Sequence, residues 1–364
     1  MKVAVLGYGT VGYGVYEMLK GAEGLEEGSV LVRPGKADAP YKVSSIEDIL
    51  NDDTIDAVAE VMGGIEPAYT YASAAIAAKK HFVTSNKALV AAKGIELSNL
   101  AKENGVAFLF SAACGGGVPF LHNISLAVES DEILSLGGIL NGTTNYMLDS
   151  MQSLNLSYED ALKDAQKLGY AEADPTADVS GLDALRKIML GCAVAYDMLP
   201  FDGLLNEGIE SFSSDDVNYI KSKGLTCRLI VSGGKVGDKL YAYVEPVLFK
   251  ANAPECSVVK NYNMAKYEGK YSGPIVLMGQ GAGRWPTASA VIRDLSDICS
   301  GRRHMMRSDC KKVSADNSVI SHKYLLRVGS EYSITDVISV KDMHEKAAAL
   351  RSEGKNVFFA ALED

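Results

Sequence analysis

The amino-terminal segment MKVAVLGYGTVGYGVYEMLK places three glycines at the spacing GxGxxG, between an apolar run and a helical pattern. The run MKVAVLG has the character of a buried strand, and TVGYGVYEMLK has helical periodicity. At such a junction Gly7 permits a tight turn, Gly9 lets the backbone approach a ligand, and Gly12 lets the helix pack on the strand. This arrangement predicts that the chain opens with an α/β domain.

The alternation of strand and helix continues through the first third of the chain. Strands are predicted at SVLVR, DAVAEVM, HFVTS and VAFLFSA. Ser44 and Glu47 have capping-box spacing at the start of a short helix, SSIEDIL. Pro67 suits the first turn of a helix at EPAYTYASAAIAAKK, and a further helix is predicted to end near Asn104 and Gly105. The pattern predicts a Rossmann-type, doubly wound parallel sheet with ligands at the carboxyl ends of its strands.

The middle of the chain has a different pattern. SDEILSLGGIL is predicted to be a strand, and TTNYMLDSMQSL and SYEDALKDAQKLG are predicted helices, the second closed by Gly169. CRLIVSGGKVGDKLYAYVEPVLF has the pattern of a hairpin that turns at its glycines. Near the carboxyl terminus the order strand, strand, helix, strand is predicted. We therefore expect a second, α+β domain and a short α+β C-terminal tail.

Composition excludes several classes of protein. The chain has 364 residues, with 36 Lys and Arg against 46 Asp and Glu, and a net charge of -10 disfavours a nucleic-acid partner. The six cysteines are scattered without the close spacing of a zinc site or redox pair, so reduced thiols in the cytoplasm are expected. No apolar segment is long and unbroken enough to act as a secretory signal or to span a membrane.

The glycine motif predicts a dinucleotide cofactor. Its pyrophosphate would bind at the amino terminus of the first helix, near Thr10 and Val11, where free N–H groups and the helix dipole favour an anion. About 20 residues after the last glycine, an enzyme that prefers NAD would present an acidic residue, whereas this chain has Arg33 with Lys36 close by. A guanidinium suits a 2′-phosphate, which favours NADP over NAD. An exposed loop arginine without a ligand is the alternative interpretation.

An unusual density of charge follows the second of the middle helices. The segment LGYAEADPTADVSGLDALRK contains Glu172, Asp174, Asp178, Asp183 and Lys187. Asp183 and Lys187 are four residues apart, so they share a face if the segment is helical. Two interpretations are open from spacing alone: a surface ion pair that contributes little, or an acid–base site.

Several segments together resemble the homoserine dehydrogenase family. They occur in that family's order and are distributed over about residues 2–300: GYGTVG, GGIEPA, HFVTSNKAL, CGGGVP, NGTTNYML, GYAEADPTADVSGLDALRK and GQGAGRWPTASAV. The resemblance implies an NAD(P)-dependent oxidoreductase that interconverts L-aspartate 4-semialdehyde and L-homoserine in threonine and methionine biosynthesis. It also implies a cytoplasmic homodimer. Residues 1–125 and 284–302 would bind the dinucleotide, 126–283 would bind substrate and dimerise, and 303–364 would be a C-terminal segment similar to a shortened ACT unit.

The resemblance assigns roles to particular residues. Lys187 would supply the proton for the developing alkoxide, and Lys87 would be a second catalytic lysine beside nicotinamide and substrate. Glu172 would bind the substrate amino group, while Asp183 would hold its reacting end and orient Lys187. The other substrate positions are Asp178, Tyr170 and Thr143, although Thr143 and its neighbours Asn141 and Thr144 can instead cap a helix. The cofactor positions are Gly7, Gly9, Thr10, Val11, Gly12, Arg33, Gly63, Gly64, Lys87, Gly169 and Gly283.

Two features depart from the family pattern. Family members often bind a monovalent cation through a glutamate and backbone carbonyls, here those of Cys114, Gly116 and Val118, but Ser111 stands at the glutamate's position. We expect weak cation binding or none, because the site has lost its counter-charge. The tail is shorter than a full ACT domain, which argues against feedback inhibition by threonine and favours a segment that covers a sheet edge or assists dimerisation. A related oxidoreductase with another amino-acid substrate and a catalytically silent nucleotide sensor are the rival functions.

Overall fold

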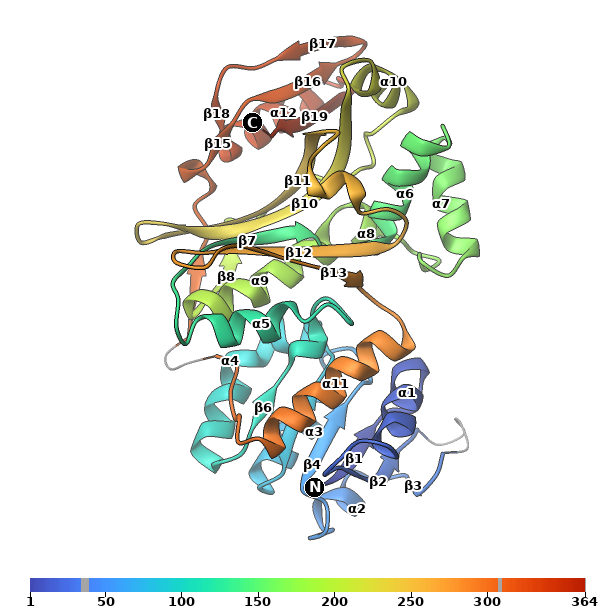
Figure 1. Cartoon of the computed structure of the whole chain (residues 1–364), viewed down its shortest axis with the longest axis vertical. Coiled ribbons are helices and arrows are strands. Elements are labelled where there is room, and N and C mark those ends of the chain that lie inside the picture. The colour runs from blue at the N-terminus through green and yellow to red at the C-terminus, as the bar shows by residue number, and fades with distance from the viewer. Residues whose placement is uncertain (34–38, 307–309, 364) are drawn as a thin grey trace. The chain divides into compact units, whose positions relative to one another are not determined.

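The computed structural model describes residues 1–33, 39–306 and 310–363. The chain divides into two compact units, coloured by residue number in Figure 1. The first contains Met1–Glu129, Ala193–Asp197 and Gln280–Lys311, and the second contains Ser130–Cys192, Met198–Gly279 and Lys312–Asp364. Throughout the described residues, no helix combines the length and the apolar character needed to cross a membrane.

The first unit contains a parallel sheet of six strands in the order β3-β2-β1-β4-β5-β6. The strands are β1 (Lys2–Leu6), β2 (Glu26–Leu31), β3 (Lys42–Val43), β4 (Ala57–Glu60), β5 (His81–Thr84) and β6 (Phe108–Leu109). Because the strand order reverses beside β1, the crevice for a ligand is expected at the carboxyl end of that strand. The predicted doubly wound α/β sheet is confirmed.

The helices of this unit are α1 (Thr10–Leu19), α2 (Glu47–Leu50), α3 (Ala68–Ala77), α4 (Lys87–Asn104), α5 (Phe120–Ala127) and α11 (Arg284–Cys299). Helix α1 packs on α11, and α3 packs on α4 (Figure 1). A Cβ atom at Gly12 would lie 2.0 Å from the Gly7 carbonyl oxygen, so glycine is required there. Gly105 ends α4 with φ of 70°, as predicted.

Two helix starts differ from the sequence prediction. The capping box of Ser44 with Glu47 is wrong: the hydroxyl of the next residue, Ser45, accepts the Glu47 N–H at 3.1 Å. Two serines are adjacent, and the turn geometry rather than the spacing selects between them. Pro67 is the N-cap of α3 and does not lie in its first turn.

The second unit is organised around a nine-stranded mixed sheet, with the order β13-β12-β7-β10-β11-β19-β16-β17 and with β9 also paired to β11. Strands β10 and β11 form the predicted hairpin, which turns at Gly237 with φ of 61°. The strands of the sheet are β7 (Ile133–Ile139), β9 (Leu205–Asn206), β10 (Leu225–Val236), β11 (Lys239–Lys250), β12 (Tyr262–Gly269), β13 (Gly273–Gln280), β16 (Tyr324–Val328), β17 (Glu331–Ile334) and β19 (Val357–Leu362).

Helices α6 to α10 and α12 accompany this sheet. Their bounds are α6 (Gly142–Ser153), α7 (Tyr158–Lys167), α8 (Thr176–Val179), α9 (Leu182–Tyr196), α10 (Ser214–Ser222) and α12 (Val340–Ser352). Short strands complete the chain: β8 (Met198–Asp202), β14 (Lys311–Ser314), β15 (Ser321–His322) and β18 (Ile338–Ser339). Gly169 follows the C-cap of α7 with φ of 76°, the left-handed conformation that glycine adopts most easily.

The C-terminal segment is built into the sheet of the second unit. Strand β19 pairs in parallel with β11 and antiparallel with β16, so the segment covers the edge of the long hairpin. Tyr324, Met343 and Phe359 from this segment share one buried core with Phe249 of β11. The predicted strands and helix are present, and of the roles considered for the segment the structure displays the covering of a sheet edge.

Candidate active site

A buried lysine–carboxylate pair lies in the second unit. Lys187 Nζ on α9 is 2.7 Å from Asp183 Oδ2 and donates a hydrogen bond to the backbone carbonyl of Leu140 at 2.6 Å. Both side chains are about nine-tenths buried, with 11% and 10% exposed. The predicted pairing on one helix face is confirmed, but its interpretation as a surface ion pair is wrong. Burial makes the pair dependent on its hydrogen-bond partners.

Asn141 connects this pair to a second carboxylate. Its side-chain oxygen accepts the Thr144 N–H at 2.8 Å and so caps α6. Its side-chain nitrogen donates to Asp178 Oδ1 at 2.7 Å and to Asp183 Oδ2 at 2.9 Å. Capping, one of the two interpretations of NGTTN, is confirmed for Asn141. The bridge between two aspartates was not predicted, and the only signal for it in the sequence was the NGTT cap pattern.

The pKa of the second carboxylate, that of Asp178, lies above its ordinary value. Burial raises the pKa of Asp178, and the nearby charge of Asp183 raises it further, whereas the hydrogen bond from Asn141 acts in the opposite direction. Two carboxylates held by one amide and one ammonium form a compact acid–base cluster. Clusters of this kind occur preferentially at functional sites.

The remaining predicted substrate residues differ in the contacts that they form. Thr143 donates its hydroxyl hydrogen to the Tyr170 carbonyl at 2.7 Å, and the Tyr170 ring lies edge-on to Tyr146 with centroids 5.1 Å apart. Glu172 is exposed, and across the described part of the chain its carboxylate forms no hydrogen bond or ion pair. Asp174 accepts the Thr176 N–H at 3.1 Å and is a turn residue.

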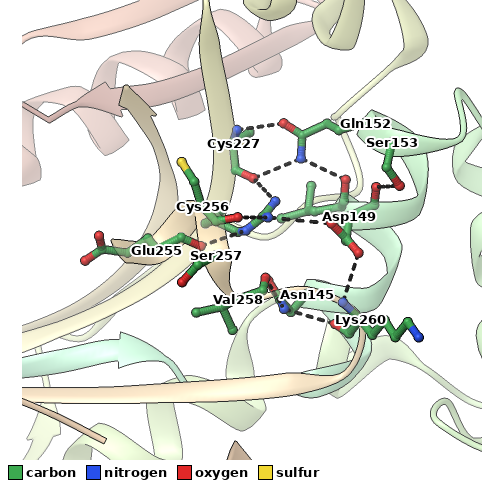
Figure 2. A network of polar contacts seen from close by, with 12 residues as sticks. Asn145, Asp149, Gln152, Ser153, Cys227, Glu255, Cys256, Ser257, Val258 and Lys260 are labelled. Carbon is green, nitrogen blue, oxygen red and sulfur yellow. Dashed lines mark hydrogen bonds and ion pairs between the residues drawn. The ribbon is translucent and has the colours of Figure 1, made fainter. Parts of the chain in front are cut away.

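Helix α6 is fixed by polar contacts along its length (Figure 2). Asn145 donates to the Lys260 carbonyl at 3.0 Å. Gln152 donates to the Cys227 carbonyl at 3.0 Å and accepts the Cys227 N–H at 2.7 Å. These contacts hold α6 against β10 and the loop before β12, so its N-cap Asn141 has a defined position relative to α8 and α9.

The first unit contains a cavity of about 690 Å³ at the carboxyl ends of β1 and β2. Gly7, Gly9, Arg33 and Gly63 line it, as predicted for a dinucleotide site. Thr10, Val11 and Gly12 form the first turn of α1 directly after Gly9, and Gly64 follows Gly63 with φ of 78°. Arg33 is exposed, and Lys36 lies outside the described residues. Lining residues that were not predicted include Tyr8, Ser44, Glu66 and Tyr71.

A buried carboxylate fixes the loop that carries Gly63. Glu60, at the end of β4, accepts the Met62 N–H at 2.7 Å and the Thr84 hydroxyl at 2.5 Å. Burial raises the pKa of Glu60, and these hydrogen bonds oppose the rise. Glu60 was not predicted, because its contact with Thr84 joins two different strands, β4 and β5.

Lys87 is the first residue of α4 and is half-buried in the first unit. The preceding residue, Asn86, caps the helix by accepting the Leu89 N–H at 3.1 Å. The lysine thus has a defined place at the carboxyl end of β5, where a cofactor edge is expected. The expected action of Lys87 and Lys187 on one substrate remains a prediction.

The segment expected to hold a cation is anchored by a carboxylate from α11. Ser111 donates its N–H to Asp294 Oδ2 at 2.8 Å, and its hydroxyl donates to Asp294 Oδ1. Burial raises the pKa of Asp294 to about 7, against the lowering effect of the Ser111 hydrogen bonds. Ser111 therefore serves an internal hydrogen bond at the position where the family glutamate was expected.

Two features together are typical of a dinucleotide-dependent oxidoreductase. One is the parallel sheet with its glycine turn and cavity, and the other is the buried lysine–carboxylate cluster. Family models match twice, as "Homoserine dehydrogenase, NAD binding domain" over residues 7–111 and as "Homoserine dehydrogenase" over residues 119–296. The chain belongs to the homoserine dehydrogenase family, whose members are NAD(P)-dependent oxidoreductases acting on a CH–OH group.

Individual relatives agree with this assignment. The homoserine dehydrogenase of Bacillus subtilis is 33% identical over 383 aligned residues, which cover 97% of this chain and 88% of the relative. That of Synechocystis is 38% identical over 316 residues, covering 82% and 73%. The crystal structure of a homoserine dehydrogenase from Thiobacillus denitrificans has a TM-score of 0.89 and 29% identity, and covers 100% of this chain and 98% of that one.

Proposed function

We propose that the chain interconverts L-aspartate 4-semialdehyde and L-homoserine, with Lys187 as the proton donor and acceptor. The buried cluster of Lys187, Asp183, Asn141 and Asp178 carries this proposal, because it places an ammonium between fixed partners. A nicotinamide cofactor supplies the hydride chemistry when it is bound. Lys187 would donate a proton to the oxygen formed by aldehyde reduction and would take it back in alcohol oxidation.

The carboxylates would position the substrate. Glu172 is exposed and able to meet a substrate ammonium, and Asp183 would both orient Lys187 and bind the reacting end. Tyr170 and Gly169 would contribute backbone contacts, with Thr143 holding the Tyr170 carbonyl in place. Lys87 would act from α4 as the second catalytic lysine. Gly283, the N-cap of α11 with φ of 118°, would allow close approach of backbone to the cofactor.

We infer that residues 1–125 and 284–302 bind the dinucleotide, that 126–283 bind substrate and dimerise, and that 303–364 form an accessory segment. A homodimer in the cytoplasm is our inference from the family. Light scattering of the purified protein would measure its molar mass in solution and so its oligomeric state.

The proposed mechanism assigns no step to a monovalent cation. Asp294 already accepts two hydrogen bonds from Ser111, and its pKa of about 7 weakens it as a permanent counter-charge. The carbonyls of Cys114, Gly116 and Val118 would be the remaining ligands. We therefore keep the prediction of weak cation binding or none.

Turnover is the direct test of the proposed function. Purified protein mixed with homoserine and NADP is expected to produce reduced nicotinamide, measured by absorbance. Turnover only with another amino alcohol would identify the related oxidoreductase. Cofactor binding without turnover on any candidate amino alcohol would favour the nucleotide sensor.

Cofactor choice is tested at Arg33. We infer that this exposed guanidinium at the cavity contacts the 2′-phosphate of NADP. Arg33→Ala is expected to weaken NADPH binding about tenfold and to leave NADH binding nearly unchanged. Fluorescence titration with both cofactors measures this, and NADH is the internal control. Equal losses for the two cofactors would remove Arg33 from the phosphate site.

A further inference from the structure

Arg284 is the first residue of α11, the helix that packs on α1. It is exposed, and its guanidinium carbon lies 5.0 Å from the centroid of the Tyr13 ring. A cation–π contact of this length restricts the motion of a long side chain. The contact therefore directs the positive charge toward α1.

The packing of the two helices places this charge near the start of α1. A Cβ atom at Gly14 would lie 3.0 Å from Arg284 Cγ and 3.0 Å from Ala288 Cβ, so the first turns of α11 rest on α1 at Gly14. Thr10 precedes Gly14 by four residues and lies on the same face, about 6 Å nearer the amino terminus of α1. Tyr13, which supports the guanidinium, is also in that part of the helix.

Aromatic contacts link this position to the cavity. The Tyr13 ring lies 6.0 Å from the ring of Tyr8, and Tyr8 lines the 690 Å³ cavity. The Tyr13 ring also contacts the ring of Trp285, with centroids 6.4 Å apart, and Trp285 is 50% exposed. The guanidinium thus contacts Tyr13, and Tyr13 contacts Tyr8, which lines the cavity together with Gly7 and Gly9.

The amino terminus of α1 has no charge of its own to meet an anion. Its N-cap is Gly9, no side chain caps it, and no acidic residue occupies its first turn. Backbone N–H groups and the helix dipole provide only partial positive charge there. A pyrophosphate carries full negative charges, and an arginine fork matches phosphate oxygens in geometry.

We propose that Arg284 is a further phosphate-binding residue, which contacts the pyrophosphate of the dinucleotide from the start of α11. The inference rests on the proposed cofactor site at the glycine turn. It assigns Arg284 a role different from that of Arg33, since the pyrophosphate is common to NAD and NADP and the 2′-phosphate is not.

The test compares cofactor affinities by fluorescence titration, without turnover. Arg284→Met keeps an apolar stem against Tyr13 and is expected to weaken NADPH and NADH equally, by about tenfold each. Lys20→Met is the matched control, because Lys20 also lies over a tyrosine of α1, 5.4 Å from the Tyr16 centroid, but at the opposite end of the helix. It is expected to leave both affinities unchanged. Arg284→Lys should retain part of the affinity, and that part should fall as salt is added.

Several results would overturn the proposal. Affinities of Arg284→Met within about twofold of the wild type would remove Arg284 from the site. A loss confined to NADPH would make it a 2′-phosphate residue instead. A loss that follows a lower thermal unfolding midpoint, and that Arg284→Lys does not recover, would assign the residue to the contact between α1 and α11. If the wild-type protein binds neither cofactor, the proposed function itself fails.

Discussion

Lys187→Met is expected to lower kcat for homoserine oxidation about a thousandfold while NADPH binding stays nearly unchanged. In the proposed mechanism Lys187 exchanges a proton with the substrate oxygen, and Asp183 and the Leu140 carbonyl fix its side-chain nitrogen from two sides. Without it, the hydroxyl proton of homoserine must pass to water, and the negative charge that develops on the substrate oxygen loses its stabilising cation. Steady-state kinetics together with fluorescence titration of NADPH measure the two quantities separately.

The variant also leaves the Asp183 carboxylate buried without its cation. A buried pair broken on one side costs about 3–5 kcal/mol of folding free energy. The double variant Lys187→Met/Asp183→Asn removes both charges and is expected to recover much of the stability but none of the activity. Lys163→Met is the matched control, because Lys163 of α7 pairs with Asp160 at 3.8 Å and both side chains are exposed. A kcat within about tenfold of the wild type in a folded Lys187→Met protein would move proton transfer to another group.

The features that sequence predicted well are local ones. GxGxxG specifies its turn because each glycine answers a steric demand of neighbouring backbone, as the 2.0 Å approach at Gly12 demonstrates. Asp183 and Lys187 could be paired on one face because four residues make about one helical turn. Gly105 ends α4 for an equally local reason, its positive φ.

The partners that complete the site are distant in sequence. Asn141 reaches Asp178 and Asp183 across 37 and 42 residues, and Ser111 reaches Asp294 across 183. These contacts depend on which strands pair and on how α6 meets α8 and α9, and no spacing rule encodes that. The prediction of Ser44 instead of Ser45 as the capping residue was wrong for a local reason. Backbone turn geometry differs between adjacent residues of the same type, and spacing alone does not distinguish them.

Arg327→Met is expected to reduce the free energy of unfolding by about 3–5 kcal/mol. Arg327, on β16, is 4% exposed, and its Nε donates to Asp216 Oδ1 at 2.7 Å. Its other nitrogens donate to the carbonyls of Ser211 and Gly329, at 2.9 and 3.0 Å. The carboxylate of Asp216 is fully buried, so removing the guanidinium leaves a charge with hydrogen bonds but no counter-ion.

The location of this pair extends its effect beyond the C-terminal segment. Arg327 lies on β16, which pairs with β19, and β19 in turn pairs with β11 of the long hairpin. Since Phe249 of β11 and Phe359 of β19 belong to one core cluster, detaching the C-terminal strands exposes part of that core. We therefore expect Arg327→Met to destabilise β10 and β11 together with β16 and β19.

Chemical denaturation followed by circular dichroism measures the loss, and amide hydrogen exchange locates it. Exchange is expected to rise in β10 and β11 as well as in the C-terminal strands. Lys341→Met is the control within the same segment, since its pair with Glu345 is 3.9 Å long and largely exposed, and such pairs contribute little. If faster exchange in Arg327→Met were confined to residues 321–363, the segment would be a separable module of the second unit, and its sheet pairing with β11 would contribute little to stability.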